Sequence, residues 1–163
     1  MKNTNTILTD KVALKKKALQ EAINKHQQVI DDFKTRMSAL LSERAVAQEG
    51  KIDNEIQSKT AESIITRVNP LGEQLAFANN EMRLLNEMAT RPNEVHGHVQ
   101  LGSIVITDKG TFFVSASIEQ FMVDGEKIFG LSTLAPLYER MKGKKKGESF
   151  TYKETTYTIK DLF

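Results

Sequence analysis

Apolar residues recur with alternating spacings of four and three in two stretches of the first half of the chain. The average spacing of 3.5 residues keeps one stripe of a helix facing a partner helix along its whole length, as in a coiled coil. We call these positions the seam residues: Leu19, Ile23, His26, Ile30, Phe33, Met37 and Leu40 in the first stretch, and Ile64, Val68, Leu71, Leu75, Ala78, Met82, Leu85 and Ala89 in the second.

The seam lapses between the two stretches, over a polar segment that contains Gly50. The first helix is predicted to begin at Thr9 or Asp10, whose side chains can cap a helix, and to run to about Gln48. The second is predicted from about Asp53 to Thr90. We therefore expect one antiparallel helical hairpin over residues 1–92, with its tip at about 48–55. A hairpin has too little interior for an ordinary enzyme core and is better suited to carrying its tip to a distant place.

Three positions in this half allow two interpretations each. Pro70 either kinks the second helix or breaks it, giving three helices, and the unbroken phase of the seam favours the kink. His26 is expected to pack its ring in the seam with its polar edge at the rim. The run Lys15–Lys17 suggests either a nucleic-acid patch or a solvated helix face, and we favour the face.

From residue 98 onward the sequence changes to short runs rich in β-branched and aromatic residues, separated by turn signals such as Asp124-Gly125. The predicted strands are His98–Thr107, Thr111–Ser117, Lys127–Leu131, Ser149–Tyr152 and Thr156–Leu162.

One short helix, Thr133–Met141, is predicted among the strands, with Ser132 as its cap, Pro136 in its first turn and Gly143 just past its end. The predicted class is α+β: a coiled-coil hairpin followed by a small antiparallel sheet domain over residues 97–163. A domain of this size is close to the lower limit for a self-sufficient core, so packing against the base of the hairpin would stabilise it.

The 163-residue chain has a net charge of +2, which does not require a nucleic-acid partner. Cysteine is absent, which excludes disulfides, cysteine-ligated zinc and thiol catalysis. Neither a signal peptide nor an apolar run long enough to span a membrane is visible. We expect a soluble cytoplasmic protein with no membrane partner, and a monomer whose helices pair within the chain.

The layout and several motifs together resemble the Gre-type bacterial transcript-cleavage factors. The segment Leu101–Val105 resembles the opening strand of that family's sheet domain. Gly130–Leu137 resembles the family's strand-into-helix segment, and Lys142–Glu148 resembles its glycine-lysine turn before the closing hairpin. The motifs cover about residues 99–162, and the layout covers most of the chain.

The resemblance implies an FKBP-like sheet domain that docks on RNA polymerase and a hairpin that reaches through the secondary channel to the active centre. Acidic residues at the tip then help hold a Mg²⁺ ion shared with the polymerase, which cleaves its own backtracked RNA by two-metal hydrolysis. The factor has no cofactor of its own, is not an enzyme by itself, and contacts nascent RNA only indirectly. The docking candidates are Ser132, Pro136, Lys142, Lys144, Lys145 and Lys146.

The tip departs from the family pattern, which reads Asp-Leu-x-Glu-Asn-x-Glu-Tyr. Asp53 aligns with the family's first Glu, whereas the family's Asp falls on Gly50, beside Glu49. Lys51 would oppose Mg²⁺ binding. The candidates for assisting the metal are Glu49, Asp53 and Glu55, which can equally be ordinary loop and helix-cap residues.

Other functions stay open. A Gre-like protein could enter the channel without stimulating cleavage. A coiled-coil adaptor or chaperone would need exposed apolar residues near the tip, for which Val46, Ile52 and Ile56 are candidates. A prolyl isomerase cleft could be lined by the aromatic residues of the sheet domain. His96 and His98 are interpreted as linker residues rather than metal ligands.

Overall fold

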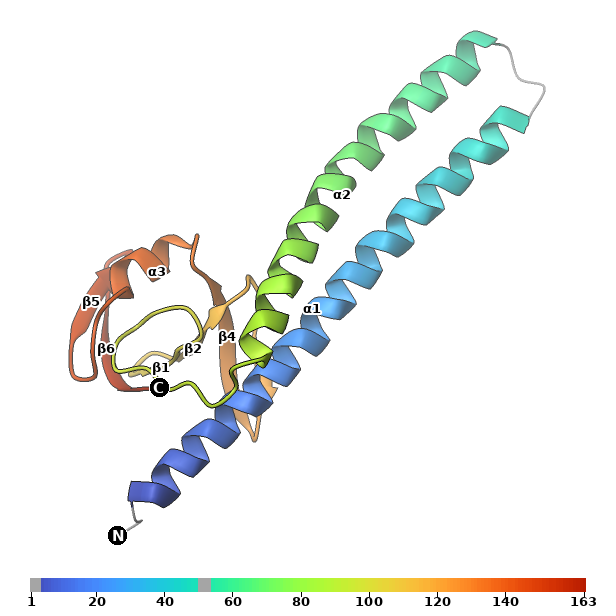
Figure 1. The fold of residues 1–163 in the computed structure, drawn as a ribbon. Coiled ribbons are helices and arrows are strands. Elements are labelled where there is room, and N and C mark those ends of the chain that lie inside the picture. The colour runs from blue at the N-terminus through green and yellow to red at the C-terminus, as the bar shows by residue number, and fades with distance from the viewer. Residues whose placement is uncertain (1–3, 50–53) are drawn as a thin grey trace. The chain divides into compact units, whose positions relative to one another are not determined.

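The structure is a computed structural model that describes the backbone of residues 4–49 and 54–163, and the side-chain environments of residues 9–46 and 58–163. Two long helices come first, α1 (Thr4–Glu49) and α2 (Asn54–Ala89) (Figure 1). Six strands and one short helix follow: β1 (Ile104–Thr107), β2 (Thr111–Ser115), β3 (Phe121–Val123), β4 (Glu126–Ser132), α3 (Pro136–Met141), β5 (Ser149–Tyr152) and β6 (Thr155–Leu162). The predicted α+β class is confirmed.

The chain folds into two compact units. The helical unit comprises His26–Asn80, and the sheet unit comprises Met1–Lys25 together with Glu81–Phe163. These units differ from the predicted ranges 1–92 and 97–163, because the first turns of α1 and the last turns of α2 pack with the sheet. The prediction that the base of the helices supplements the small sheet core is thereby confirmed.

Within the helical unit, α1 and α2 are antiparallel. His26 of α1 contacts Ala78 of α2, while Glu43, further along α1, forms an ion pair with Arg67, which lies earlier in α2. All ten seam residues of this unit are buried or half-buried: His26, Ile30, Phe33, Met37, Leu40, Ile64, Val68, Leu71, Leu75 and Ala78. The seam is therefore the face through which the two helices pack.

Two expectations about the helices need correction. α1 begins at Thr4 rather than at Thr9 or Asp10. His26 does not keep a polar edge at the rim: it is only 2% exposed, and its Nε2 lies 2.8 Å from the carbonyl oxygen of Ala78. A hydrogen bond to the facing backbone satisfies Nε2 inside the seam, so this nitrogen has no need to reach water.

α2 continues through Pro70, so the alternative with three helices is wrong. In a regular helix the N–H of residue 70 would bond the carbonyl oxygen of Thr66, but proline has no N–H. Both Pro70 and Thr66 are exposed. Water can hydrogen-bond that carbonyl on the outer side of the helix. The helix therefore tolerates the proline at this position.

The six strands form one sheet in the order β3-β4-β2-β1-β6-β5. The neighbours are antiparallel except β2 and β4, which are parallel with Thr111 opposite Ile128 and Ser115 opposite Ser132. The prediction of an antiparallel sheet is thus wrong for one pair. β3 intervenes between β2 and β4 and pairs with β4 as a hairpin, so β4 runs in the same direction as β2.

Residues 98–103 do not continue the first strand, contrary to the prediction of a strand over His98–Thr107. Gly102 has a positive φ of 84°, which an extended strand does not allow. The Ser103 hydroxyl also accepts a hydrogen bond from the Gln100 amide, closing a tight loop before β1. Of the remaining predicted strands, Ser149–Tyr152 has the observed limits, and the other three differ from β2, β4 and β6 by one or two residues at an end. The short strand β3 was not predicted.

The two faces of the sheet belong to different cores because successive strand residues point to opposite sides. Phe113, Ile104 and Ile128 join a core that includes Ala18, Leu19 and Ala22 of α1 and Leu85 of α2. On the other face, Phe112, Val105 and Ile159 pack with Tyr138 and Met141 of α3. The sheet is therefore covered by the helix bases on one side and by α3 on the other.

α3 begins at Pro136, later than predicted, and Ser132 does not cap it. The N-cap residue is Ala135, which makes no side-chain cap, and Pro136 occupies the first helical turn as expected. The Ser132 hydroxyl instead accepts a hydrogen bond from the Leu134 amide, which closes the turn between β4 and α3. Gly143 follows the helix end with a φ of 74°, in agreement with the prediction.

Candidate functional site

The three tip candidates cannot be placed. Asp53 lies outside the residues that the structure describes. Glu49 ends α1 and Glu55 lies in the first turn of α2, but the environments of their side chains are also outside the described residues. Within the described residues, we find no cluster of three or more His, Asp or Glu side chains that could hold a metal ion.

The docking candidates lie at the end of β4, in α3 and in the turn that follows α3. Ser132 is buried and Pro136 is exposed. In the turn, the Lys144 backbone is paired with Val99 and Met141, which fixes the loop, and the Lys145 amide donates to the Glu148 carboxylate. The lysine side chains are exposed or half-exposed, so this turn presents a small basic surface, which we call the lysine turn (142–148).

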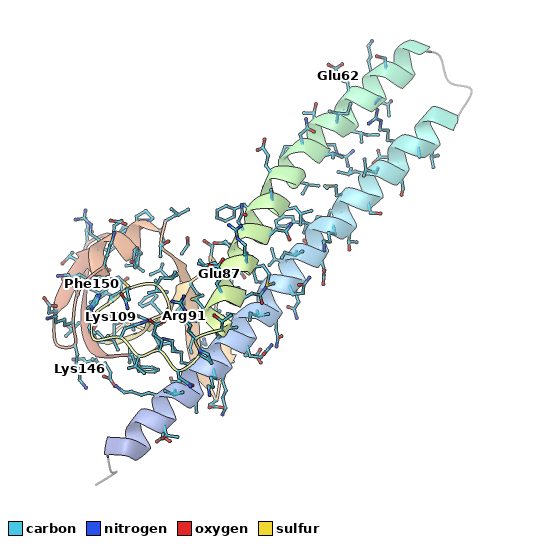
Figure 2. All side chains as sticks on the ribbon, viewed as in Figure 1. Glu62, Glu87, Arg91, Lys109, Lys146 and Phe150 are labelled. Atoms are coloured by element: carbon cyan, nitrogen blue, oxygen red, sulfur yellow. The ribbon has the colours of Figure 1, made fainter. Side chains whose placement is uncertain are left out.

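Two of these lysines have partners within the protein. The Lys146 Nζ lies 3.2 Å from Asp161, which also accepts a hydrogen bond from Lys11 of α1 at 2.7 Å. Burial raises the pKa of Asp161, but the hydrogen bonds from Lys11 and Lys146 outweigh it, and the pKa lies below its ordinary value. The Lys142 amine lies 5.9 Å from the centre of the Tyr138 ring. Figure 2 shows Lys146 at the outer edge of the sheet unit. Its charge is partly neutralised by Asp161, whereas Lys144 and Lys145 are better placed for an external partner.

The lysine run of α1 is not a uniformly solvated face, and that prediction is wrong for Lys15. Lys16 and Lys17 are exposed, but Lys15 is only 5% exposed and its amine donates a hydrogen bond to the Glu94 carbonyl oxygen. Burial lowers the pKa of Lys15 to about 8, against a smaller opposing effect of the Glu94 carboxylate.

His96 is likewise more than a linker residue. It is 8% exposed, and its Nδ1 lies 3.0 Å from the hydroxyl of the fully buried Ser103. Burial, followed by the nearby Lys15 cation, holds the pKa of His96 below its ordinary value. The imidazole is therefore mainly neutral at pH 7.

Lys15 and His96 line a half-enclosed cavity of about 310 Å³ in the sheet unit. Gly102 sits between them: a side-chain carbon at this position would lie 3.3 Å from the His96 ring and 3.9 Å from the Lys15 amine. The rest of the lining combines apolar residues that are buried or half-buried with polar residues that are exposed, and consists of Leu19, Leu84, Glu87, Met88, Thr90, Arg91, Pro92, Glu94, Leu101 and Phe113.

A pattern in the sequence identifies Lys15 in retrospect. Lys15, Ala18, Leu19 and Ala22 follow the spacing i, i+3, i+4, i+7, which marks one face of a helix, and all four are buried. A lysine within such a face is buried together with it. No comparable pattern points to His96, whose burial depends on the loop fold before β1.

Comparisons with known proteins add no identification. No protein-family model, curated protein or solved structure matches the chain. In the part of the chain that the structure describes, none of the helices combines the length and apolar character needed to cross a lipid bilayer.

Proposed function

We propose that this chain is a Gre-like factor that binds bacterial RNA polymerase, inserts the tip of its helical unit into the secondary channel and modulates transcript cleavage or pausing. The observation that supports this most is the antiparallel pairing of α1 and α2 through an apolar seam. Two paired helices form a narrow body, since each helix with its side chains is about 10–12 Å across.

The length of the helical unit suits such a role. Residues 26–49 of α1 rise about 36 Å at 1.5 Å per residue, and residues 54–80 of α2 rise about 40 Å. The outer faces of these helices are largely polar and exposed, apart from scattered apolar side chains. A narrow, polar, elongated unit can enter a water-filled channel without needing an apolar binding site.

The lysine turn is the proposed docking surface. Among the ion pairs of the described residues, none involves the side-chain amines of Lys144 and Lys145, so these amines can meet an acidic surface of the polymerase. Ser132 and Pro136 position this surface through the turn before α3 and the first turn of α3 itself.

At the tip, Glu49 and Asp53 would assist a Mg²⁺ ion held by the polymerase, with Glu55 nearby. The metal would supply the activated water and stabilise the developing charge, and the protein would contribute carboxylates only. In this proposal the chain is a monomer and not an enzyme by itself. Lys51 in the same segment favours the variant of the proposal in which the factor enters the channel without stimulating cleavage.

One observation favours a second candidate, a coiled-coil adaptor or chaperone. Val46 is 71% exposed near the end of α1, and Leu41 and Phe77 are each about half exposed in the same unit. Exposed apolar side chains of this size can bind a client protein. These side chains are scattered over both helices of the unit, so the polymerase-binding proposal remains the first.

The deciding experiment is a cleavage assay on a backtracked elongation complex, with polymerase binding measured in parallel. Wild type is compared with Asp53→Asn and Glu49→Gln, and with Glu62→Gln as a control, since Glu62 is an exposed acidic residue of α2 outside the predicted tip segment 48–55 (Figure 2). Mg²⁺-dependent RNA shortening that is lost only in the tip variants would support a cleavage factor.

Binding without cleavage, together with displacement of a channel-entering factor, would support the non-cleaving regulator. Lys144→Ala with Lys145→Ala should weaken that binding, whereas Lys109→Ala, an exposed lysine in the β1–β2 turn, should not. Absence of polymerase binding would overturn both forms of the proposal and leave the adaptor.

A further inference from the structure

We propose that the Lys15 cavity is a binding site for a small aldehyde with an apolar body, which the Lys15 amine captures as an imine. This inference is independent of polymerase binding. It rests on three features of the sheet unit: a buried amine, a cavity that it lines, and the apolar wall beside it.

The amine is positioned by its surroundings. Its hydrogen bond to the Glu94 carbonyl oxygen uses one of the three donors of the ammonium group. Gly102 borders the amine closely: a side-chain carbon there would lie 3.9 Å from the Lys15 amine and 3.3 Å from the His96 ring. Any larger residue at this position would therefore crowd the amine and the imidazole.

The lining favours an apolar ligand over an anion. The cationic groups that line the cavity are Lys15 and Arg91, and they are balanced by the exposed Glu87 and Glu94. With no net positive charge, the cavity offers little attraction for a phosphate or a carboxylate. Its lining instead includes five apolar side chains that are buried or half-buried, those of Leu19, Leu84, Met88, Leu101 and Phe113.

The volume limits the size of the ligand. At about 310 Å³, the cavity is at the low end of the range for small-molecule sites. A single aromatic ring bearing one carbonyl group fits within such a space, whereas a nucleotide or a peptide segment does not.

The reaction balances without any further reagent. The lone pair of the Lys15 Nζ attacks the carbonyl carbon, and the electrons of the C=O bond move to oxygen, which takes up a proton that the nitrogen loses. The resulting carbinolamine releases water as the C=N bond forms. Each aldehyde bound consumes one unprotonated amine and yields one imine and one water molecule.

The lowered pKa supports this chemistry, because only the unprotonated amine is a nucleophile. With a pKa of about 8, roughly a quarter of the Lys15 amine is unprotonated at pH 7.5. An ordinary lysine is unprotonated to roughly one part in a thousand at that pH. Burial lowers the pKa of Lys15 and the Glu94 carboxylate opposes it. The other titratable or charged groups that line the cavity are Glu87, Arg91 and the neutral His96.

The test is reductive trapping with benzaldehyde and cyanoborohydride at pH 7.5, followed by peptide mapping. We expect Lys15 to gain a benzyl group at least about tenfold faster than its exposed neighbour Lys16. The rate at Lys15 should saturate with benzaldehyde concentration and fall when benzyl alcohol is added as a competitor, while the rate at Lys16 should do neither.

Two variants control the experiment. Lys15→Arg keeps the positive charge and can still donate to Glu94, but it has no reactive amine, so fast labelling should disappear while the fold is retained. Lys16→Arg should leave fast labelling unchanged. Labelling of Lys15 at the rate of Lys16 would overturn the proposal, as would fast labelling that neither saturates nor responds to benzyl alcohol.

Discussion

The amine of Lys15 in α1 donates a hydrogen bond to the backbone carbonyl oxygen of Glu94, 79 residues further along the chain. This bond ties the first helix to the loop between α2 and β1 within the sheet unit. Because the amine is buried, its protonation is coupled to folding, and the stability of the unit should depend on pH in a defined direction.

We expect the free energy of unfolding to increase between about pH 8 and pH 10. The pKa of Lys15 is lowered to about 8 in the folded protein, whereas an unfolded lysine titrates near 10.4. In this window the unfolded state binds more protons, so stability increases with pH, by up to about 3 kcal/mol from this group.

The measurement is urea unfolding at pH 7.5 and pH 10 for wild type and Lys15→Met. Because other groups also titrate at high pH, the informative quantity is the difference between the two proteins. At pH 7.5 Lys15→Met should have a higher free energy of unfolding than wild type, because methionine has no charge to bury. This difference should shrink or vanish at pH 10. A difference that is constant across this range would contradict the burial of a charged Lys15.

A second prediction concerns Gly130 in β4, which has no room for a side chain. A side-chain carbon there would lie 2.6 Å from the Cβ of Ile118 and 2.9 Å from the Ala116 carbonyl oxygen. Gly130→Ala should therefore destabilise the protein by about 2–3 kcal/mol, since the backbone of residues 116–118 must shift.

Gly72 in α2 provides the matched control, because nothing lies within 4 Å of a side-chain carbon at that position. Gly72→Ala should stabilise the helix by about 0.5–1 kcal/mol, as alanine has the higher helix propensity. Thermal unfolding of both variants checks the pair. Equal effects of the two substitutions would contradict the packing of β4 against residues 116–118.

The third prediction separates packing from hydrogen bonding at His26. His26→Leu should change stability by less than about 1 kcal/mol, because leucine fills the seam and the Ala78 carbonyl can keep its bond within α2. His26→Ala should cost about 2 kcal/mol, because it leaves a cavity between the helices. Chemical unfolding followed by circular dichroism measures both. If the free energy of unfolding falls as much in the leucine variant as in the alanine variant, the hydrogen bond contributes more to stability than the packing does.

The fourth prediction concerns Asp161, the shared partner of Lys11 and Lys146. Since the folded pKa lies below the ordinary value, the stabilisation is present above about pH 4 and is lost as the pH falls through the folded pKa. Asp161→Asn should cost about 1 kcal/mol at pH 7 and should reduce the acid sensitivity of the protein. Lys146→Ala should have a smaller effect, because Lys11 remains paired and is the less exposed of the two lysines.

The sequence predicted the elements that depend on local pattern. The seam spacing located both helices, and Asp124-Gly125 correctly marked a tight turn, since both residues adopt the positive φ that such hairpins need. The turn between β5 and β6 gave no such signal, because there Lys153 and Glu154 adopt positive φ values in place of the usual glycine or asparagine.

Features that depend on distant parts of the chain were not predictable. β3 has only three residues, and its central Met122 is exposed, so the run carries too little pattern to be recognised. The parallel pairing of β2 with β4 depends on that missed strand. A lysine run is usually solvated, and only the packing of α1 on the sheet decides that Lys15 is buried while Lys16 is not.

The core that joins the helix bases to the sheet has a consequence for synthesis on the ribosome. It brings Ala18, near the start of the chain, together with Phe163, which is 1% exposed, and β1 pairs with β6. The contacts that define the helical unit lie within residues 26–80, so they can form while translation continues. The sheet unit must wait until β6 has left the exit tunnel, so during that interval the apolar face of the first turns of α1 is available to chaperones.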